Sequence, residues 1–218
     1  MFTTDSVFKR SIGNDTLSEN EYNGLIGISL FWGFAINYLI VANVPADAIP
    51  FWPLIIGYFI SAFAGIAIAH GSDDPIISFF GYNLVVIPVG FVINVGLQGY
   101  DPNLIINAIM VTAIVTGIMM FLGITYPKFF RSIEGTLFWS LLAAIVAELI
   151  LILVFKRSLG FMDWIVALIF CGYIGLDWGR AQSIPKNANN AIDSVVALYI
   201  DIINLFVRLL SIMSGKDD

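Results

Sequence analysis

The chain has 218 residues, of which 59% are hydrophobic and only 12% are charged, and its formal net charge is −6. The mean hydropathy of +0.90 is far above what a surface facing water tolerates, so a soluble protein is excluded. The acidic balance argues against a nucleic-acid partner, and the single cysteine, Cys171, excludes a disulfide framework. The composition predicts an integral membrane protein.

Apolar runs follow one another along the chain, and each is long enough to cross about 30 Å of hydrocarbon as a helix. Proline and aspartate mark the short loops between them. Helices are predicted because a segment in lipid must satisfy its own backbone hydrogen bonds, and the runs are too long for barrel strands. The runs cover residues 24–43, 51–69, 76–97, 104–124, 135–155, 161–178 and 191–213.

These runs predict an all-α integral membrane protein with a seven-transmembrane-helix bundle over residues 24–213. A polar N-terminal segment, 1–23, precedes the bundle, and a short acidic tail, 214–218, follows it. Lysine and arginine are more frequent on the N-terminal side of the runs, which favours a cytoplasmic N-terminus. Short loops and the absence of a retention signal favour a bacterial plasma membrane.

The second run carries a small residue at every fourth position, which makes a smooth stripe along one helix face. The first interpretation is close packing against another helix. The alternative is a surface that slides, which would make this helix a mobile gate. The stripe consists of Gly57, Ser61, Gly65 and Ala69.

Among the acidic residues inside apolar runs, three stand out, Glu148, Asp177 and Asp201, because a charge there costs about 2.5 to 3.5 kcal/mol. Asp201, Asn204 and Arg208 share one face of the last run. Asp177 and Asp201 lie at depths of about 10 Å and about 15 Å from the loop that joins their two runs. Helices joined by a short loop are usually antiparallel neighbours, which allows the two aspartates to meet. Because their depths are not equal, contact between them stays open.

Two carboxyl groups in contact cannot both ionise cheaply, so Asp177 and Asp201 would share a proton and act as a pH sensor. Without contact, Asp201 would pair with Arg208 or with a neighbouring helix and stabilise the bundle. Glu148 is either an ion ligand on the opposite half of an ion path or a protonated carboxyl bonded to a neighbouring helix, and we favour the second. Asn204 and Arg208 are secondary polar sites.

Two stretches, "GYIGLDWGRAQ" and "ALYIDIINLFVRLL", resemble motifs of the Bax inhibitor family, and weaker similarity covers nearly the whole chain. The first resembles the family's Tyr-x-x-x-Asp, here Tyr173 and Asp177. The second resembles its Leu-Tyr-x-Asp-x-x-Asn-Leu-Phe, here Leu198, Tyr199, Asp201, Asn204, Leu205 and Phe206. The resemblance implies seven helices with the last one central, and a pH-sensitive calcium leak governed by Asp177 and Asp201.

The resemblance also implies a basic residue at the cytoplasmic end of the second helix that latches onto the aspartate pair. The only candidate for such a latch in this sequence is His70. A histidine titrates in the physiological range, so a latch based on it would weaken as the pH rises. The alternative is that His70 lies in the headgroup region of the membrane.

The leading hypothesis is a passive, pH-sensitive cation leak channel in the lipid bilayer, with calcium as the transported ion and with no cofactor. Asp177 and Asp201 would bind calcium weakly and transiently, because two carboxylates fall far short of its usual shell of about six to eight oxygens. An enzyme is not expected, since the chain has no nucleophile elbow, phosphate loop or metal-ligand spacing. One alternative is a non-conducting interaction protein that regulates a membrane protease or another membrane partner. The other is a proton-coupled small-solute transporter, which the lack of an internal repeat disfavours.

Overall fold

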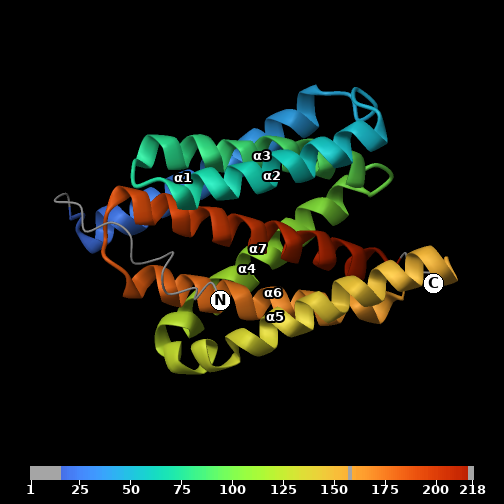
Figure 1. Cartoon of the computed structure of the whole chain (residues 1–218). Helices are drawn as coiled ribbons and strands as arrows, with labels where there is room; N and C mark the ends of the chain where they lie inside the picture. The colour runs from blue at the N-terminus through green and yellow to red at the C-terminus, as the bar shows by residue number, and fades with distance from the viewer. Residues whose placement is uncertain (1–15, 157–158, 216–218) are drawn as a thin grey trace. The chain divides into compact units, whose positions relative to one another are not determined.

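The computed structural model of the chain describes residues 16–156 and 159–215, and these form long α-helices without a strand (Figure 1). In this described part of the chain, seven helices are long and apolar enough to cross a membrane, which confirms the predicted all-α, seven-helix fold class. Residues 1–15 and 216–218, most of the two predicted terminal segments, lie outside the described residues. The helices are α1 (Glu19–Asn43), α2 (Phe51–Gly71), α3 (Pro75–Gly96), α4 (Pro102–Thr125), α5 (Pro127–Ile150), α6 (Gly160–Ser183) and α7 (Ala188–Ser214), with a π-helical turn, η2 (Leu151–Phe155), after α5.

The chain divides into two compact units. Unit 1 comprises Met1–Gly99 and Ser183–Tyr199, and therefore contains α1, α2, α3 and the first part of α7. Unit 2 comprises Tyr100–Gln182 and Ile200–Asp218, and therefore contains α4, α5, α6 and the rest of α7. Each unit is described by itself below.

Two helices begin more than one helical turn earlier than the apolar runs predict. Helix α1 starts at Glu19 rather than at residue 24, because Ser18 and Glu21 form a capping box that satisfies the first backbone N–H groups. Helix α5 starts at Pro127 rather than at residue 135. Proline fits the first turn of a helix, and the polar residues of the next two turns hide this part of the helix from a hydropathy profile.

In unit 1, the later part of the small-residue stripe of α2, from Ser61 to Ala69, packs directly on α3, whereas Gly57 is exposed. A Cβ atom added to Gly65 would lie 2.5 Å from the carbonyl oxygen of Gly81, so only glycine allows this approach. Ser61 Oγ donates a hydrogen bond of 2.7 Å to the carbonyl oxygen of Leu84. That carbonyl lies four residues before Pro88, which has no N–H to offer it, and α3 runs through Pro88 as one helix. These contacts agree with the packing interpretation of the stripe, and the sliding gate stays a prediction.

In unit 2, α6 packs closely on both α4 and α5. A Cβ atom on Gly123 of α4 would collide with the backbone of Gly175 on α6, and one on Gly175 would collide with the ring of Phe130 on α5. Leu137 of α5 covers Gly172 in the same way. Small residues on α6 therefore set the distance to its two neighbours.

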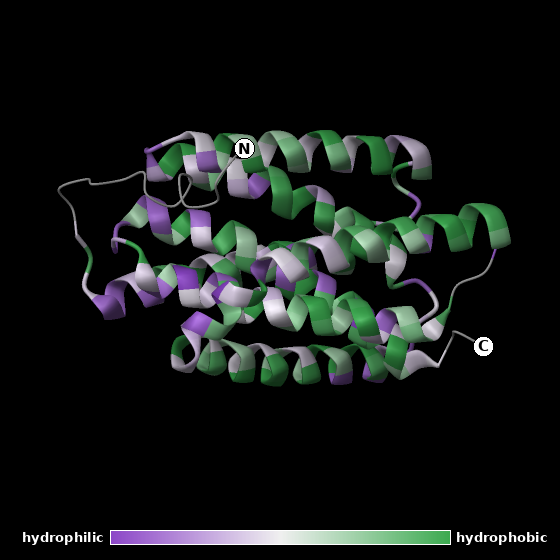
Figure 2. Ribbon diagram, turned by 60° about the horizontal axis from the view of Figure 1, so that its bottom comes forward, coloured by the Kyte–Doolittle hydropathy of each residue, from purple (hydrophilic) through white to green (hydrophobic). Residues whose placement is uncertain are grey.

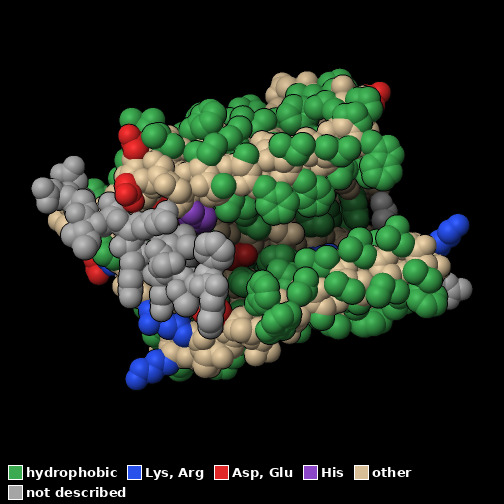
Figure 3. Space-filling model, in the orientation of Figure 1, with side chains coloured by type: hydrophobic (Ala, Val, Ile, Leu, Met, Phe, Trp, Pro, Cys, Tyr) green, Lys and Arg blue, Asp and Glu red, His purple; other side chains and the backbone are tan. Residues whose placement is uncertain are grey.

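The outer faces of the helices are apolar along most of their length (Figure 2). Hydrophobic side chains cover most of the face displayed in Figure 3, and charged side chains lie mainly towards the helix ends. Large exposed apolar side chains include Phe31, Phe63, Phe121, Trp139 and Leu168. A surface of this kind suits contact with lipid tails, as expected of a multi-pass membrane protein.

Candidate functional site

Asp177 of α6 and Asp201 of α7 meet inside unit 2, where their carboxyl groups lie close enough to interact directly. Asp201 is 6% exposed, and the Asp177 side chain is 13% exposed. Oδ2 of Asp201 is buried and has no hydrogen-bond partner among the described residues. The structure thus brings together the two acids whose contact the sequence left open, because α6 continues to Ser183 and places Asp177 well inside the membrane-spanning segment.

The two aspartates differ in their neighbours. Arg180, one turn after Asp177, donates a hydrogen bond of 3.2 Å to Oδ1 of Asp177 and also pairs with Glu134 of α5. Asp201 forms no ion pair within the described part of the chain. Tyr173 lies near enough to interact electrostatically with both aspartates. Asp177 therefore has a positive counter-ion, whereas Asp201 has the other carboxyl group as its partner.

This arrangement can hold one proton or attract one cation. Two adjacent carboxylates repel each other, so a single shared proton or a nearby positive ion relieves the repulsion. Sequence reasoning missed the Arg180–Glu134 pair, because both residues read as parts of polar helix ends. The sequence offered a weak signal only for the contact between Arg180 and Asp177, because Arg180 lies three residues after Asp177 on the same helix face.

A second charged cluster of unit 2 surrounds Arg208 on α7. Its guanidinium donates one hydrogen bond to Glu148 of α5 and one to Asp163 of α6, and it forms an ion pair with each of these acids. Glu148 is therefore bonded to a neighbouring helix, as favoured, but its partner is an arginine. Within the described residues, Arg208 pairs with these acids and not with Asp201. Asp163 was missed because it lies in the first turn of α6, where an acid usually serves only the helix end.

The other polar residue predicted on this face, Asn204, makes a local contact. Its Nδ2 donates a hydrogen bond of 2.8 Å to the carbonyl oxygen of Ile200, one turn earlier on α7. This bond holds the amide along its own helix. Within the described residues, no hydrogen bond joins Asn204 to either aspartate of the pair.

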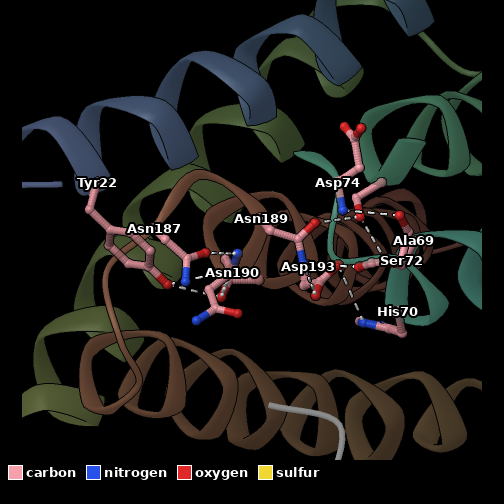
Figure 4. Close-up of polar contacts among 11 residues, drawn as sticks. Tyr22, Ala69, His70, Ser72, Asp74, Asn187, Asn189, Asn190 and Asp193 are labelled. Carbon is pink, nitrogen blue, oxygen red and sulfur yellow. Dashed lines mark hydrogen bonds and ion pairs between the residues drawn. The ribbon is translucent and has the colours of Figure 1, made fainter. Parts of the chain in front are cut away.

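His70 lies at the end of α2 in unit 1, in a polar network with the first part of α7 (Figure 4). Its Nδ1 is 3.7 Å from Oδ1 of Asp193, an ion pair only when the imidazole is protonated. Asn189 donates hydrogen bonds to Asp193 and to the carbonyl oxygen of Ser72, and accepts one from Ser78. Sequence reasoning missed Asp193 as the acidic partner of His70. A latch between His70 and the Asp177–Asp201 pair stays a prediction.

Parts of this sequence are similar to known proteins. A family model described as inhibitor of apoptosis-promoting Bax1 matches residues 19–218. Protein LIFEGUARD 1 of Arabidopsis thaliana is 34% identical over 118 residues, which is 49% of each chain. Uncharacterized membrane proteins of Streptococcus pyogenes serotype M3 and Vibrio cholerae serotype O1 are 24% and 36% identical over 59% and 44% of each chain. The chain spans about half the length of the curated relatives it matches.

Proposed function

The chain belongs to the Bax inhibitor family, and on this basis we propose that it is a pH-sensitive passive cation leak channel with calcium as the transported ion. Asp177 and Asp201 form the sensor. The observation that supports the proposal is the contact between their carboxyl groups inside membrane-spanning helices. Its physical basis is the cost of charge in a membrane.

The paired carboxyl groups can exist in two charge states. With one proton between them, they carry one negative charge, part of which Arg180 balances from the Asp177 side. Without that proton they carry two, and the repulsion between them must be balanced by a cation or by separation of α6 and α7. Asp201 is the acid that takes the proton, because Arg180 stabilises the ionised form of Asp177. Proton binding and cation binding at the pair therefore compete, and this competition makes the flux sensitive to pH.

Calcium fits this site as a weakly and transiently bound ion. Carboxylate oxygens are hard ligands that calcium prefers, but two aspartates supply only part of its usual shell of about six to eight oxygens. A calcium ion at the pair therefore keeps much of its water, binds weakly and leaves readily. Passage through the protein requires neither a cofactor nor a catalytic step.

The remaining parts of the proposal concern the gate and the membrane. Helix α2 is the candidate gate because it carries the small-residue stripe. His70 is the candidate latch because it lies at the end of that stripe, in the last turn of α2. The host membrane is a bacterial plasma membrane, an assignment supported by the bacterial relatives that are named as membrane proteins.

The proposal is tested by calcium flux into dye-loaded liposomes that contain the purified protein, scanned between about pH 6 and 8. Wild type is compared with Asp177→Asn, Asp201→Asn and the control Asp47→Asn, which neutralises an exposed carboxylate in a loop. We expect a pH-dependent flux in wild type and in the control, and a shifted or lost pH dependence in the other two variants.

Two other results would contradict the leak. If wild type conducts nothing at any pH, the aspartates are structural or serve a partner, as in the interaction-protein alternative. If a proton gradient drives uphill accumulation of a solute, the protein is a transporter, because a passive leak cannot produce accumulation.

A further inference from the structure

Arg208 of α7 is held by carboxylates from two other helices of unit 2. Its Nη1 lies 2.6 Å from Oε1 of Glu148 and 2.5 Å from Oδ1 of Asp163, and its Nη2 lies 2.8 Å from Oε2 of Glu148. The three side chains are between 10% and 27% exposed. One guanidinium thus ties α5 and α6 to the second part of α7.

The acids of this cluster share helix faces with the acids near the aspartate pair. Glu134 and Glu148 on α5 are separated by 14 positions, and so are Asp163 and Asp177 on α6. This separation is close to four helical turns and corresponds to about 20 Å along each helix. We call these four residues and Asp201 the acidic seam.

Helix α7 contributes to both ends of the acidic seam. Arg208 follows Asp201 by 7 positions, close to two turns, so the two side chains lie on the same face of α7. The long arginine side chain spans the remaining distance to Glu148 and Asp163. Each of α5, α6 and α7 therefore supplies charged groups to the cluster around Asp177 and to the cluster around Arg208.

Stability alone does not account for the Arg208 cluster. Buried ion pairs are often replaced by well-packed apolar residues at no cost, because removing the charges from water offsets their attraction. Arg208 also carries one positive charge against two carboxylates, so the cluster stays acidic. Its Nη1 contacts an oxygen of each carboxylate. The guanidinium therefore occupies the space between two acids that repel each other when it leaves.

We propose that Arg208 is a tethered cation that blocks the acidic seam between Glu148 and Asp163, at the end away from the Asp177–Asp201 pair. The inference rests on the proposed leak, because a block has meaning only where cations move along the seam. Release of Arg208 from the two carboxylates opens this end of the seam, and a passing cation then replaces the guanidinium between the same oxygens.

The flux test compares wild type with Arg208→Gln, Arg208→Lys and the control Lys128→Gln, which removes an exposed positive charge at the start of α5. Calcium entry into dye-loaded liposomes should be several-fold faster for Arg208→Gln. It should stay near the wild-type rate for Arg208→Lys, which keeps a cation between the acids, and for the control. Where Arg208→Gln does not fold, the double variant Arg208→Gln/Glu148→Gln keeps the net charge of the cluster, and its flux should still exceed that of wild type, by less because one of the two carboxylates is gone.

A second measurement does not depend on conduction. Calcium chloride should raise the Tm of Arg208→Gln in detergent more than that of wild type, because two vacated carboxylates bind the ion and binding to the folded state stabilises it. The triple variant Arg208→Gln/Glu148→Gln/Asp163→Asn lacks these ligands and should respond no more than wild type.

The outcomes separate this inference from the proposed function. Equal calcium flux in wild type and Arg208→Gln, with both above protein-free liposomes, overturns the block and leaves the leak standing. Flux at the protein-free level in both overturns both. A Tm response to calcium that is the same in Arg208→Gln and in the triple variant also overturns the block, whatever the flux.

Discussion

Unit 1 holds its buried polar side chains largely with neutral hydrogen bonds, whereas the polar clusters of unit 2 are held by ion pairs. In unit 1, Asn37 donates a hydrogen bond of 2.6 Å to the hydroxyl of Tyr199, and Tyr82 donates one of 3.0 Å to the carbonyl oxygen of Ser29. In unit 2, Arg180 and Arg208 each join acids of different helices. Substitutions in the neutral network should therefore change stability alone, and substitutions in the ionic clusters should change both stability and ion flux.

The largest effect on stability is expected for Arg208→Gln. Loss of the guanidinium leaves Glu148 and Asp163 close together without a counter-ion, and breaking a buried ion pair in this way costs about 3 to 5 kcal/mol. Unfolding in mixed detergent measures the loss against Lys128→Gln as the reference. A loss no greater than that of the reference would mean that the cluster is solvated and does not hold the three helices.

A smaller effect is expected for Tyr82→Phe in unit 1. Tyr82 is fully buried, and its hydroxyl donates one neutral hydrogen bond, whose loss costs about 0.5 to 1.5 kcal/mol. The free energy of unfolding should fall by this amount, while calcium flux and its response to pH stay as in wild type. A changed pH response of calcium flux in Tyr82→Phe would contradict the expectation that substitutions in the neutral network of unit 1 change stability alone.

The smallest effect is expected for His70→Gln, at the one ion pair of unit 1 that depends on an imidazole. The contact with Asp193 is long, 3.7 Å, so its contribution is about 0 to 1 kcal/mol. Burial of the imidazole disfavours its protonated form more than this long contact favours it, so protonation at acidic pH weakens the folded state. Wild type should therefore lose stability relative to His70→Gln as the pH falls from about 8 to about 5.5. A wild type that gains stability over His70→Gln at acidic pH would show that the charged pair with Asp193 outweighs the cost of burial.

Much of the fold could be predicted because each membrane-spanning helix corresponds to one apolar run in the sequence. The early start of α1 was also readable, since Ser18 and Glu21 have the spacing of a capping box. Depth and the short loop between their helices allowed contact between Asp177 and Asp201 but did not decide it. The partners of Arg208 and His70 could not be found in this way. They depend on how each helix is rotated about its axis, and that rotation is set by packing at glycines such as Gly123 and Gly175.

The central claim, that Asp177 and Asp201 share a proton, is tested most directly by infrared difference spectroscopy of the protein in lipid, titrated between about pH 6 and 8. The account predicts one protonated carboxyl band that disappears as the pH rises and that is absent or shifted in both Asp177→Asn and Asp201→Asn. The band should persist in Asp47→Asn. A wild-type spectrum in which no carboxyl changes protonation over this range, or a band that survives in both aspartate variants, would contradict the claim.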